Sequence, residues 1–263
     1  MDIDNNQSPP LLTLLPGLDG TVELYREFCE VAGAEVESRV IGYPTERYLD
    51  LDELVEFVEE RIPEGRPVIL MGVSFSGPIA ARLLARGKRK YVAALFCTTF
   101  VTSPHPVLLK LAPLLPLRLL FLSYHISGLV RFLFFERTSS PALIKLFQQV
   151  NNQLSSSVVA GRVRSLRSVD ERKSLKDLTI PCCYLRAKND RIVPKRAVRP
   201  FRTILRGATN AGSEELPLFT VIPLSGPHAL LQCRPEESWE AIREFLREYG
   251  VSSDRPEQNR PTK

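Results

Sequence analysis

The sequence is poor in the residue types that mark several protein classes. Its 263 residues include three histidines, one tryptophan and five cysteines, and it has no internal repeat and no low-complexity tract. The cysteine count is odd and no Cys-x-x-Cys pair is present, which is not typical of a disulfide framework. Cys97, Cys182 and Cys183 lie in apolar runs, so we expect buried thiols in a protein of the reducing cytoplasm.

Long apolar segments are also scarce. The first residues, Met1 to Asn6, are acidic and polar, so we expect no secretory signal. The stretch Val107 to Leu122 is rich in leucine but is interrupted by Pro113, Pro116 and two basic residues. It is too short and too broken for a membrane span. We therefore expect no transmembrane segment, and peripheral contact with a membrane stays open.

Positive charge is in slight excess, with a net charge of +5 and an isoelectric point near 9.0. The basic residues are spread among acidic ones, and the densest clusters are Arg86 to Lys90 and Lys195 to Arg206. Neither cluster carries the interleaved aromatic residues of a nucleic-acid surface, so we expect solvated helix surfaces and no nucleic-acid partner. The chain is long enough for one large α/β domain or two small ones.

Short apolar runs alternate with helical patterns along most of the chain. The runs are continuously apolar, as in strands buried on both faces, and helical crossovers between them imply a parallel sheet. We therefore predict an α/β fold with a mostly parallel sheet of about six strands and helices on both faces. The expected strands are Leu11–Leu15, Ser38–Ile41, Val68–Met71, Tyr91–Thr98, Cys182–Ala187 and Leu218–Leu224, and the expected helices are Val22–Ala32, Leu51–Ile62, Ile79–Arg86, Lys195–Leu205 and Glu236–Tyr249.

This alternation breaks between Phe100 and Arg167, where further short helical patterns occur. We interpret residues 100–167 as a helical cap inserted into a single domain that covers residues 10–249. The tails, residues 1–9 and 252–263, are expected to be disordered. The excess of apolar residues in the cap favours a lid over an apolar cleft, and a packed insert with no ligand role is the alternative.

The segment Val68 to Gly87 has the pattern of a strand, a tight turn and a helix, with Ser74 at the turn. In a nucleophile elbow, such a turn exposes the serine hydroxyl, and small residues on either side let the strand and helix approach each other. Gly72 meets this need, whereas Ser76 stands where glycine is usual. Ser76 as the nucleophile is less favoured, because Pro78 then occupies the next-but-one position.

A serine nucleophile needs a base, usually a histidine that a carboxylate orients. Of the three histidines, His105 precedes the cap and His125 lies inside it, whereas His228 follows the last expected strand. It should emerge at the carboxyl edge of the sheet, as Ser74 does. Asp190 follows the next-to-last strand. A turn aspartate and a structural histidine are the alternatives, but their order behind the elbow favours a catalytic group.

Acyl transfer also needs hydrogen-bond donors for the tetrahedral oxyanion. One candidate is the backbone N–H of Phe75, directly after the nucleophile, and the second is that of Leu18 in the loop after the first strand. This loop, Pro16 to Gly20, contains glycines that permit unusual backbone angles. We interpret Asp19 as a brace of the loop. A plain turn is the alternative.

The ordered motifs resemble the α/β-hydrolase superfamily over residues 10–249. Leu15 to Thr21, Ser74 to Pro78 and Gly226 to His228 are similar to segments of small, esterase-like serine hydrolases, and Asp190 to Pro194 matches a common acid loop. The resemblance implies a Ser-His-Asp triad, an acyl-enzyme released by water, and no metal or organic cofactor.

We therefore expect a serine hydrolase that cleaves a small-molecule carboxylic ester with an apolar acyl or alcohol group. Two alternatives remain at this stage. The same residues can pass the acyl group to an alcohol or a lipid, which makes a transferase. A non-catalytic protein of this fold that binds an apolar ligand or a membrane surface is the other alternative. The sequence does not indicate the oligomeric state.

Overall fold

The computed structural model describes residues 8–106, 127–205 and 217–251. Outside these ranges lie His125, the leucine-rich stretch after Pro106 and the predicted tail over residues 252–263. Of the predicted tail 1–9, only residues 8 and 9 are described. The predicted cap over residues 100–167 is described only in part.

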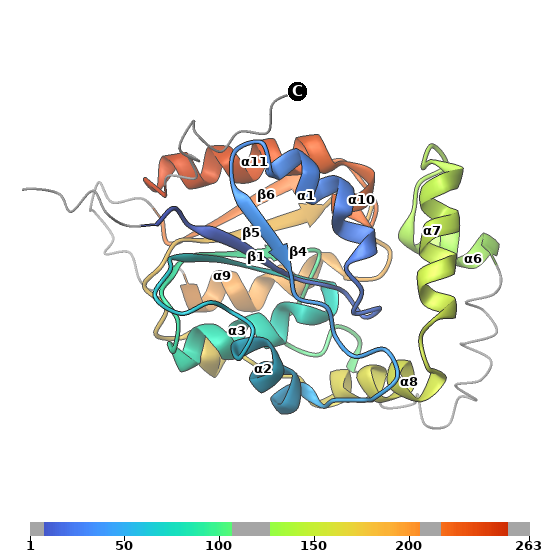
Figure 1. Cartoon of the computed structure of the whole chain (residues 1–263), viewed down its shortest axis with the longest axis horizontal. Helices are drawn as coiled ribbons and strands as arrows, with labels where there is room; N and C mark the ends of the chain where they lie inside the picture. Colours follow the sequence, from blue (N-terminus) through green and yellow to red (C-terminus); the bar gives the residue numbers. More distant parts are fainter. Residues whose placement is uncertain (1–7, 107–126, 206–216, 252–263) are drawn as a thin grey trace, which may run out of the picture.

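A single parallel sheet forms the centre of the protein. It has six strands in the order β2-β1-β3-β4-β5-β6, and each neighbouring pair runs parallel (Figure 1). This arrangement confirms the predicted fold class. The strands are β1 (Leu11–Leu15), β2 (Glu37–Val40), β3 (Val68–Val73), β4 (Tyr91–Cys97), β5 (Cys182–Ala187) and β6 (Phe219–Leu224).

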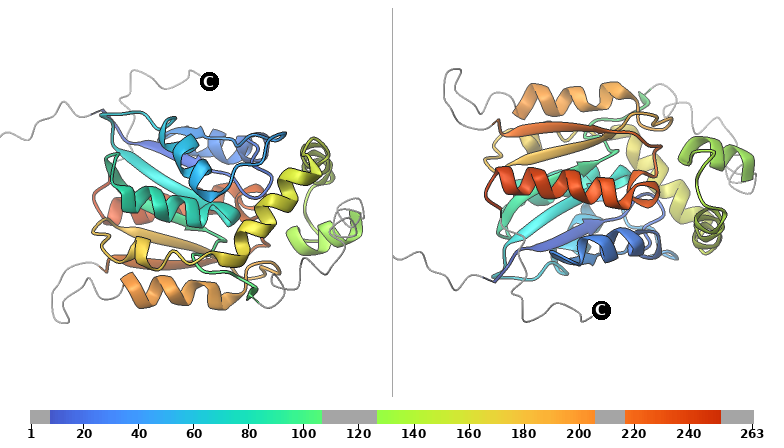
Figure 2. Two further views of the ribbon diagram at one scale, coloured as in Figure 1. Left: turned by 90° about the horizontal axis from the view of Figure 1, so that it is seen from below. Right: turned by 90° about the horizontal axis from the view of Figure 1, so that it is seen from above.

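Helices cover both faces of the sheet, as the two further views also show (Figure 2). In β4, Ala94 and Phe96 face one core, whereas Leu95 and Cys97 face the other. The sheet therefore has two apolar cores, because successive strand residues point to opposite faces and each face has its own helices. One face carries α2 (Leu51–Glu59), α3 (Gly77–Arg86) and α9 (Arg199–Leu205), and the other carries α1 (Arg26–Ala32), α10 (Leu230–Cys233) and α11 (Pro235–Glu248).

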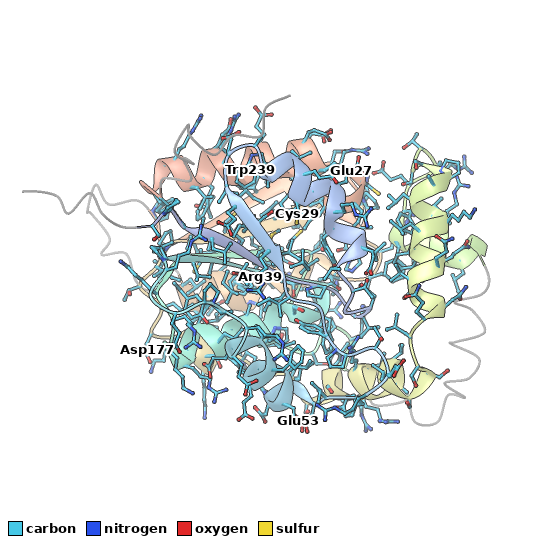
Figure 3. All side chains as sticks on the ribbon, in the orientation of Figure 1. Glu27, Cys29, Arg39, Glu53, Asp177 and Trp239 are labelled. Carbon is cyan, nitrogen blue, oxygen red and sulfur yellow. The ribbon has the colours of Figure 1, made fainter. Side chains whose placement is uncertain are left out.

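The single tryptophan joins α11 to α1, its neighbour on the same face of the sheet. Trp239 is 4% exposed, and its indole Nε1 donates to a carboxylate oxygen of Glu35, which follows α1, at 3.4 Å. Figure 3 labels Trp239 near Cys29 of α1, whereas Glu53 and Asp177 lie toward the opposite face of the molecule. Glu53 and Asp177 are both exposed to solvent.

Two predicted helices are split in the structure. Val22–Ala32 contains a 3-10 turn, Glu23–Tyr25, before α1 begins at Arg26. The segment 195–205 likewise begins with a 3-10 turn before α9. Pro200 explains the second division, because it has no N–H to donate to the carbonyl of Arg196, as a continuous α-helix requires. The short helix α10 is not among the helices predicted from the sequence.

Three helices lie beside the carboxyl ends of the strands (Figures 1 and 2). They are α6 (Ser127–Phe134), α7 (Pro141–Asn152) and α8 (Ser156–Ser165). Phe147 of α7 is buried in the same core as the α1 and α11 side chains. These helices therefore pack on the domain at the edge where Ser74 emerges. Their role as a substrate cap stays a prediction.

The burial predicted for the thiols is confirmed. Cys97, Cys182 and Cys183 are fully buried and free, and burial raises the pKa of the Cys97 thiol to about 12. Among the described residues, no helix has both the length and the apolar character needed to cross a membrane.

The close approach of α3 to the end of β4 gives a first prediction. A Cβ added at Gly77 would lie 2.6 Å from the carbonyl oxygen of Phe100 and would overlap the Thr99 hydroxyl. Backbone must therefore move, and we expect Gly77→Ala to lower the free energy of unfolding by about 1–3 kcal/mol in urea titrations. Gly128→Ala in α6 is the control, because a Cβ there has no neighbour within 4 Å. Equal stability of the two variants would contradict this account.

Candidate active site

Ser74 stands at the junction of β3 and α3 in a strained backbone conformation. Its φ is 49°, in the left-handed region that side chains other than glycine rarely adopt. The conformation follows from the tight packing behind it, where a Cβ at Gly72 would lie 2.8 Å from the Ser76 carbonyl oxygen and 2.9 Å from Ala80 Cβ. The Thr99 hydroxyl donates to the Ser74 carbonyl and holds the turn from the β4 side. This backbone geometry agrees with the predicted nucleophile elbow, and the role of Ser74 as a nucleophile stays a prediction.

Ser76, the alternative nucleophile, is directed away from the surface. It is 0% exposed, and its hydroxyl donates to the carbonyl of Pro16 and lies 2.5 Å from the Tyr43 hydroxyl. Both hydrogen bonds join the elbow to neighbouring loops. A serine where glycine is usual thus serves as a structural link, and its hydroxyl is not available for attack.

The structure brings His228 and Asp190 together beside Ser74. His228 Nε2 lies 2.9 Å from Ser74 Oγ. On the other side of the imidazole, Nδ1 lies 3.0 Å and 2.9 Å from the two carboxylate oxygens of Asp190. With Nδ1 protonated, the ring donates to Asp190 and Nε2 accepts from the serine hydroxyl. The three residues, separated in sequence, form one hydrogen-bonded series.

The loop after β5 holds the Asp190 carboxylate in place. The backbone N–H groups of Ile192 and Val193 both donate to Asp190 Oδ1 at 2.8 Å. The side chains of Asp190 and His228 are only 7% and 5% exposed, so little water competes for their hydrogen bonds. His105 serves this loop differently, because its Nε2 donates to the Ile192 carbonyl at 2.7 Å. His105 is therefore a structural neighbour of the site.

The loop after β1 lies opposite the elbow. The Gly20 N–H donates to the Gly17 carbonyl at 3.0 Å, which closes a turn around Leu18 and Asp19. In such a turn, the closing hydrogen bond does not use the N–H of the second residue, Leu18. Phe75 lies in the 3-10 turn Ser74–Ser76, where the first N–H groups have no intrahelical acceptor. Both predicted oxyanion donors therefore belong to turns that leave their N–H groups free of turn hydrogen bonds.

Asp19 is a buried carboxylate in the same loop. It is 8% exposed, and its Oδ2 accepts from the Thr21 N–H at 2.9 Å and from the Thr21 hydroxyl at 2.6 Å. Burial raises the pKa of Asp19, and the hydrogen bonds from Thr21 and the charge of Arg162 offset part of this effect. These contacts agree with the bracing role predicted for Asp19.

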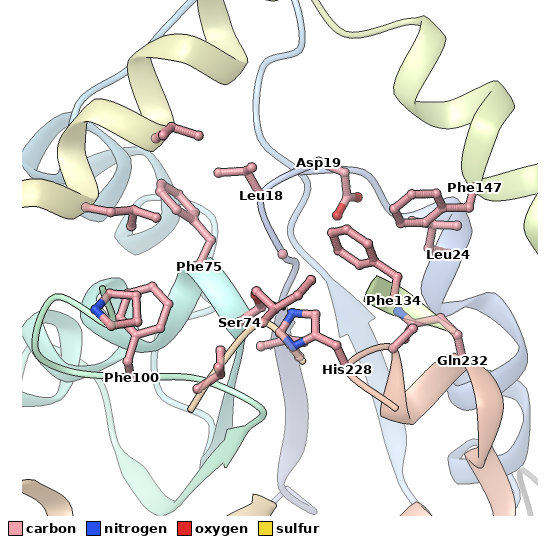
Figure 4. A pocket seen from close by; sticks show the side chains of 18 of the residues that line it. Leu18, Asp19, Leu24, Ser74, Phe75, Phe100, Phe134, Phe147, His228 and Gln232 are labelled. Atoms are coloured by element: carbon pink, nitrogen blue, oxygen red, sulfur yellow. Dashed lines mark hydrogen bonds between the residues drawn. The ribbon is translucent and has the colours of Figure 1, made fainter. Parts of the chain in front are cut away.

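An apolar cavity of about 220 Å³ opens at Ser74 (Figure 4). Its wall includes the rings of Phe100, Phe134 and Phe147, which come from distant parts of the chain. The Phe134 ring lies edge-on to the His228 imidazole, with 5.6 Å between ring centroids. The other lining residues are Gly17, Leu18, Asp19, Leu24, Tyr25, Val73, Ser74, Phe75, Pro104, His105, Val163, Leu166, Ile192, Val193, His228, Ala229 and Gln232.

Sequence reasoning missed several residues of this site. Tyr25 accepts a hydrogen bond from the Gly17 N–H at 2.8 Å through its hydroxyl, and nothing in its local pattern indicates this. Arg162 lies buried against the loop after β1, and a signal for it exists. It follows Val158 by four residues in a helix, so both side chains share one face, and Val158 is apolar. Among the described residues, no group of three or more metal-binding side chains is gathered in one place.

Comparison with known proteins identifies the family. The model of the family described as "Alpha/beta hydrolase family" matches residues 15–243, which include Ser74, Asp190 and His228. The chain belongs to the alpha/beta hydrolase family. No curated protein sequence matches it significantly. Family membership, together with the fold, supports a hydrolase activity.

Solved structures of other alpha/beta hydrolases share this fold at low sequence identity. A bacterial membrane phospholipase A is 18% identical with a TM-score of 0.73, over 92% of this chain and 80% of that one. An esterase from Exiguobacterium antarcticum is 15% identical with a TM-score of 0.71, over 92% and 93% of the two chains. An enol-lactonase from Burkholderia xenovorans is 15% identical with a TM-score of 0.70, over 94% of each chain.

The buried Asp19 predicts a pH effect on stability. The pKa of Asp19 is higher in the folded protein than in the unfolded chain. The protonated carboxyl group therefore stabilises the folded state at pH values below the unfolded pKa, and this stabilisation is lost as the pH rises through the folded pKa. The amide introduced by Asp19→Asn cannot ionise and can still accept from Thr21. The melting temperature of this variant minus that of the wild type should therefore increase between about pH 3.5 and pH 7. Asp177→Asn, at an exposed position, is the control, and a difference that falls with pH contradicts the prediction.

Proposed function

We propose that the protein is a serine hydrolase that cleaves carboxylic esters, with Ser74 as nucleophile, His228 as general base and acid, and Asp190 as the residue that orients the imidazole. The observation that carries the proposal is the unbroken series of hydrogen bonds from Ser74 Oγ through His228 to Asp190 at the wall of an apolar cavity. The strained backbone of Ser74 also supports the proposal, because strain of this kind costs free energy and clusters at active sites.

The first half of the reaction forms an acyl-enzyme. Ser74 Oγ attacks the ester carbonyl carbon while its proton passes to His228 Nε2, and Asp190 stabilises the imidazolium. The carbonyl electrons move to the oxygen, and the N–H groups of Leu18 and Phe75 donate to this oxyanion. When the carbonyl re-forms, the bond to the alcohol oxygen breaks. His228 gives its proton to that oxygen, so the alcohol leaves and the acyl group stays on Ser74.

The second half of the reaction repeats these steps with water. The oxygen of a water molecule attacks the acyl carbon while His228 takes a proton from that water. The N–H groups of Leu18 and Phe75 then donate to the second oxyanion. Collapse breaks the bond to Ser74 Oγ, which recovers its proton from the imidazolium. The products are a carboxylic acid and the regenerated serine. The edge-on Phe134 ring shields the imidazole from solvent and limits its rotation during both halves.

The cavity wall supports an apolar group on the substrate. Its side chains are mostly aromatic or aliphatic, and apolar surface is the complement of such a wall. The names of the structural neighbours, an esterase and an enol-lactonase, agree with ester-type chemistry on this fold. We therefore assign esters with an apolar acyl chain as the substrates to test first.

Labelling by a fluorophosphonate tests the nucleophile. Wild-type protein should react covalently, and Ser74→Ala should lose both the label and more than about 1,000-fold of esterase activity, because no other group replaces the attacking oxygen. The matched control is Ser238→Ala, which removes a fully buried hydroxyl of α11 that has no hydrogen-bond partner among the described residues and lies outside the elbow. Esterase activity that persists at the wild-type level in Ser74→Ala refutes the proposed function.

The acyl cavity predicts a dependence on chain length. Each buried methylene contributes about 0.8 kcal/mol, so kcat/KM for p-nitrophenyl esters should rise about fourfold per added methylene from acetate to hexanoate. Initial rates with each ester of the series give kcat/KM as a function of acyl chain length. A profile that falls with chain length would exclude the cavity beside Phe134 and Phe147 as the acyl site.

A further inference from the structure

Arg162 is a fully buried charged residue that the proposed mechanism does not use. It lies on α8 and is 1% exposed. Its Nη1 donates to the carbonyl oxygens of Leu18 at 2.7 Å and Asp19 at 2.9 Å, and its Nη2 donates to that of Pro44 at 2.8 Å. All of these acceptors are backbone carbonyls, and two of them belong to the loop that carries the proposed oxyanion donor.

The Arg162 guanidinium group is closely packed between Gly20 and Tyr43. Gly20 has a φ of +74°, and a Cβ there would lie 2.6 Å from Arg162 Nη1. The Tyr43 ring lies on another side, with its centroid 5.6 Å from the guanidinium carbon. The same Tyr43 bonds to Ser76 of the elbow through its hydroxyl. The space for Arg162 is thus formed by the residues that also position the nucleophile and the loop.

Structural packing alone does not account for this charge. No carboxylate of the described residues forms an ion pair with Arg162, and its Nε lacks a hydrogen-bond partner within the described part of the chain. Burial lowers the pKa of Arg162, with the nearby Asp19 and Tyr43 acting against this effect. Burying a cation without a paired anion is unfavourable, and an apolar side chain would join α8 to the body without that cost.

A continuous series of peptide groups connects Arg162 to the proposed oxyanion hole. Arg162 donates to the Asp19 carbonyl, whose peptide partner is the Gly20 N–H. The Gly20 N–H donates to the Gly17 carbonyl at 3.0 Å, and that carbonyl shares its peptide group with the Leu18 N–H. Each of these peptide groups accepts on the side of Arg162 and donates on the side of Leu18, so their dipoles run head to tail from the cation to the Leu18 N–H. Aligned hydrogen bonds polarise one another, so the cation strengthens the last donor.

We propose that Arg162 is a positioning residue for the oxyanion hole, which orients the loop of Leu18 and polarises its N–H toward the developing negative charge on the substrate. This inference rests on the proposed function of Ser74. Because the oxyanion exists in the transition state and not in the bound ester, the residue acts on kcat and leaves KM nearly unchanged. It also places one determinant of catalysis on α8, outside the sheet.

Substitution of Arg162 tests the inference in the full-length protein. For Arg162→Ala, we expect kcat for a p-nitrophenyl ester to fall at least about 10-fold while KM stays within about 3-fold. Binding of an alkyl boronic acid, which forms a tetrahedral anion on the serine, should weaken by a similar factor. Guanidinium chloride, at concentrations too low to unfold the protein, should restore part of kcat by entering the vacated space.

Arg82→Ala is the matched control. Arg82 is a partly buried arginine that pairs with Asp52 and Glu171 on the α2–α3 side of the protein, away from the cavity. Its loss should lower the melting temperature without changing kcat, and added guanidinium should not raise kcat. Arg162→Lys gives a second test, because it keeps a cation but cannot reach all the carbonyls. We expect its kcat and boronic-acid affinity to lie between those of the wild type and Arg162→Ala.

The outcomes separate this inference from the proposed function. An unchanged kcat and boronic-acid affinity in Arg162→Ala, with only a lower melting temperature, would show that Arg162 merely fixes α8 and would overturn the inference. Should Arg162→Ala not fold, an unchanged kcat in Arg162→Lys overturns it in the same way. If Ser74→Ala retains activity, the proposed function itself fails. If Ser74→Ala is inactive while both Arg162 variants keep their kcat, only the role of Arg162 is lost.

Discussion

The close approach of α3 to the ends of β3 and β4 is the constraint on which the rest of the site depends. Gly72 and Gly77 permit this approach, since a Cβ at either position would collide with backbone oxygen atoms. Ser74 stands in this turn at positive φ, and its side chain lines the cavity. Larger side chains at the two glycines would relax the turn and withdraw the hydroxyl.

The parallel sheet places the remaining groups around that hydroxyl. Carboxyl ends of neighbouring parallel strands lie at one edge, so the loops after β3, β5 and β6 converge there. Asp190 and His228 therefore need only short loops to meet Ser74. Backbone N–H groups of Ile192 and Val193 fix the carboxylate, and the carboxylate fixes the imidazole. The loop backbone therefore fixes the Asp190 carboxylate, and the carboxylate in turn fixes the His228 imidazole beside Ser74.

The fold, and the meeting of three candidate residues at one edge of the sheet, could be predicted because their signals are local. Continuous apolar runs identify buried strands, and Ser74, Asp190 and His228 each follow such a run in the sequence. Contacts between distant segments left no comparable signal. The hydrogen bond from the Gly17 N–H to Tyr25 and the packing of Phe134 on His228 depend on side-chain directions that only the folded structure defines. For Arg162 the signal is weak, because charge alone indicates solvent and only the apolar Val158, four residues earlier, indicates burial.

The loop after β1 shows how buried polar residues can prepare a site without touching the reacting atoms. Pro16, Leu18 and Asp19 offer their carbonyls to Ser76 and Arg162, and the Gly17 N–H is taken by Tyr25. These contacts fix each peptide plane before any substrate binds. The turn leaves the Leu18 N–H free of turn hydrogen bonds, so in the proposed mechanism the loop need not reorganise when the oxyanion forms. Under the proposed function, buried polar groups that are unfavourable for folding are favourable for catalysis, because folding orders the loop before the reaction begins.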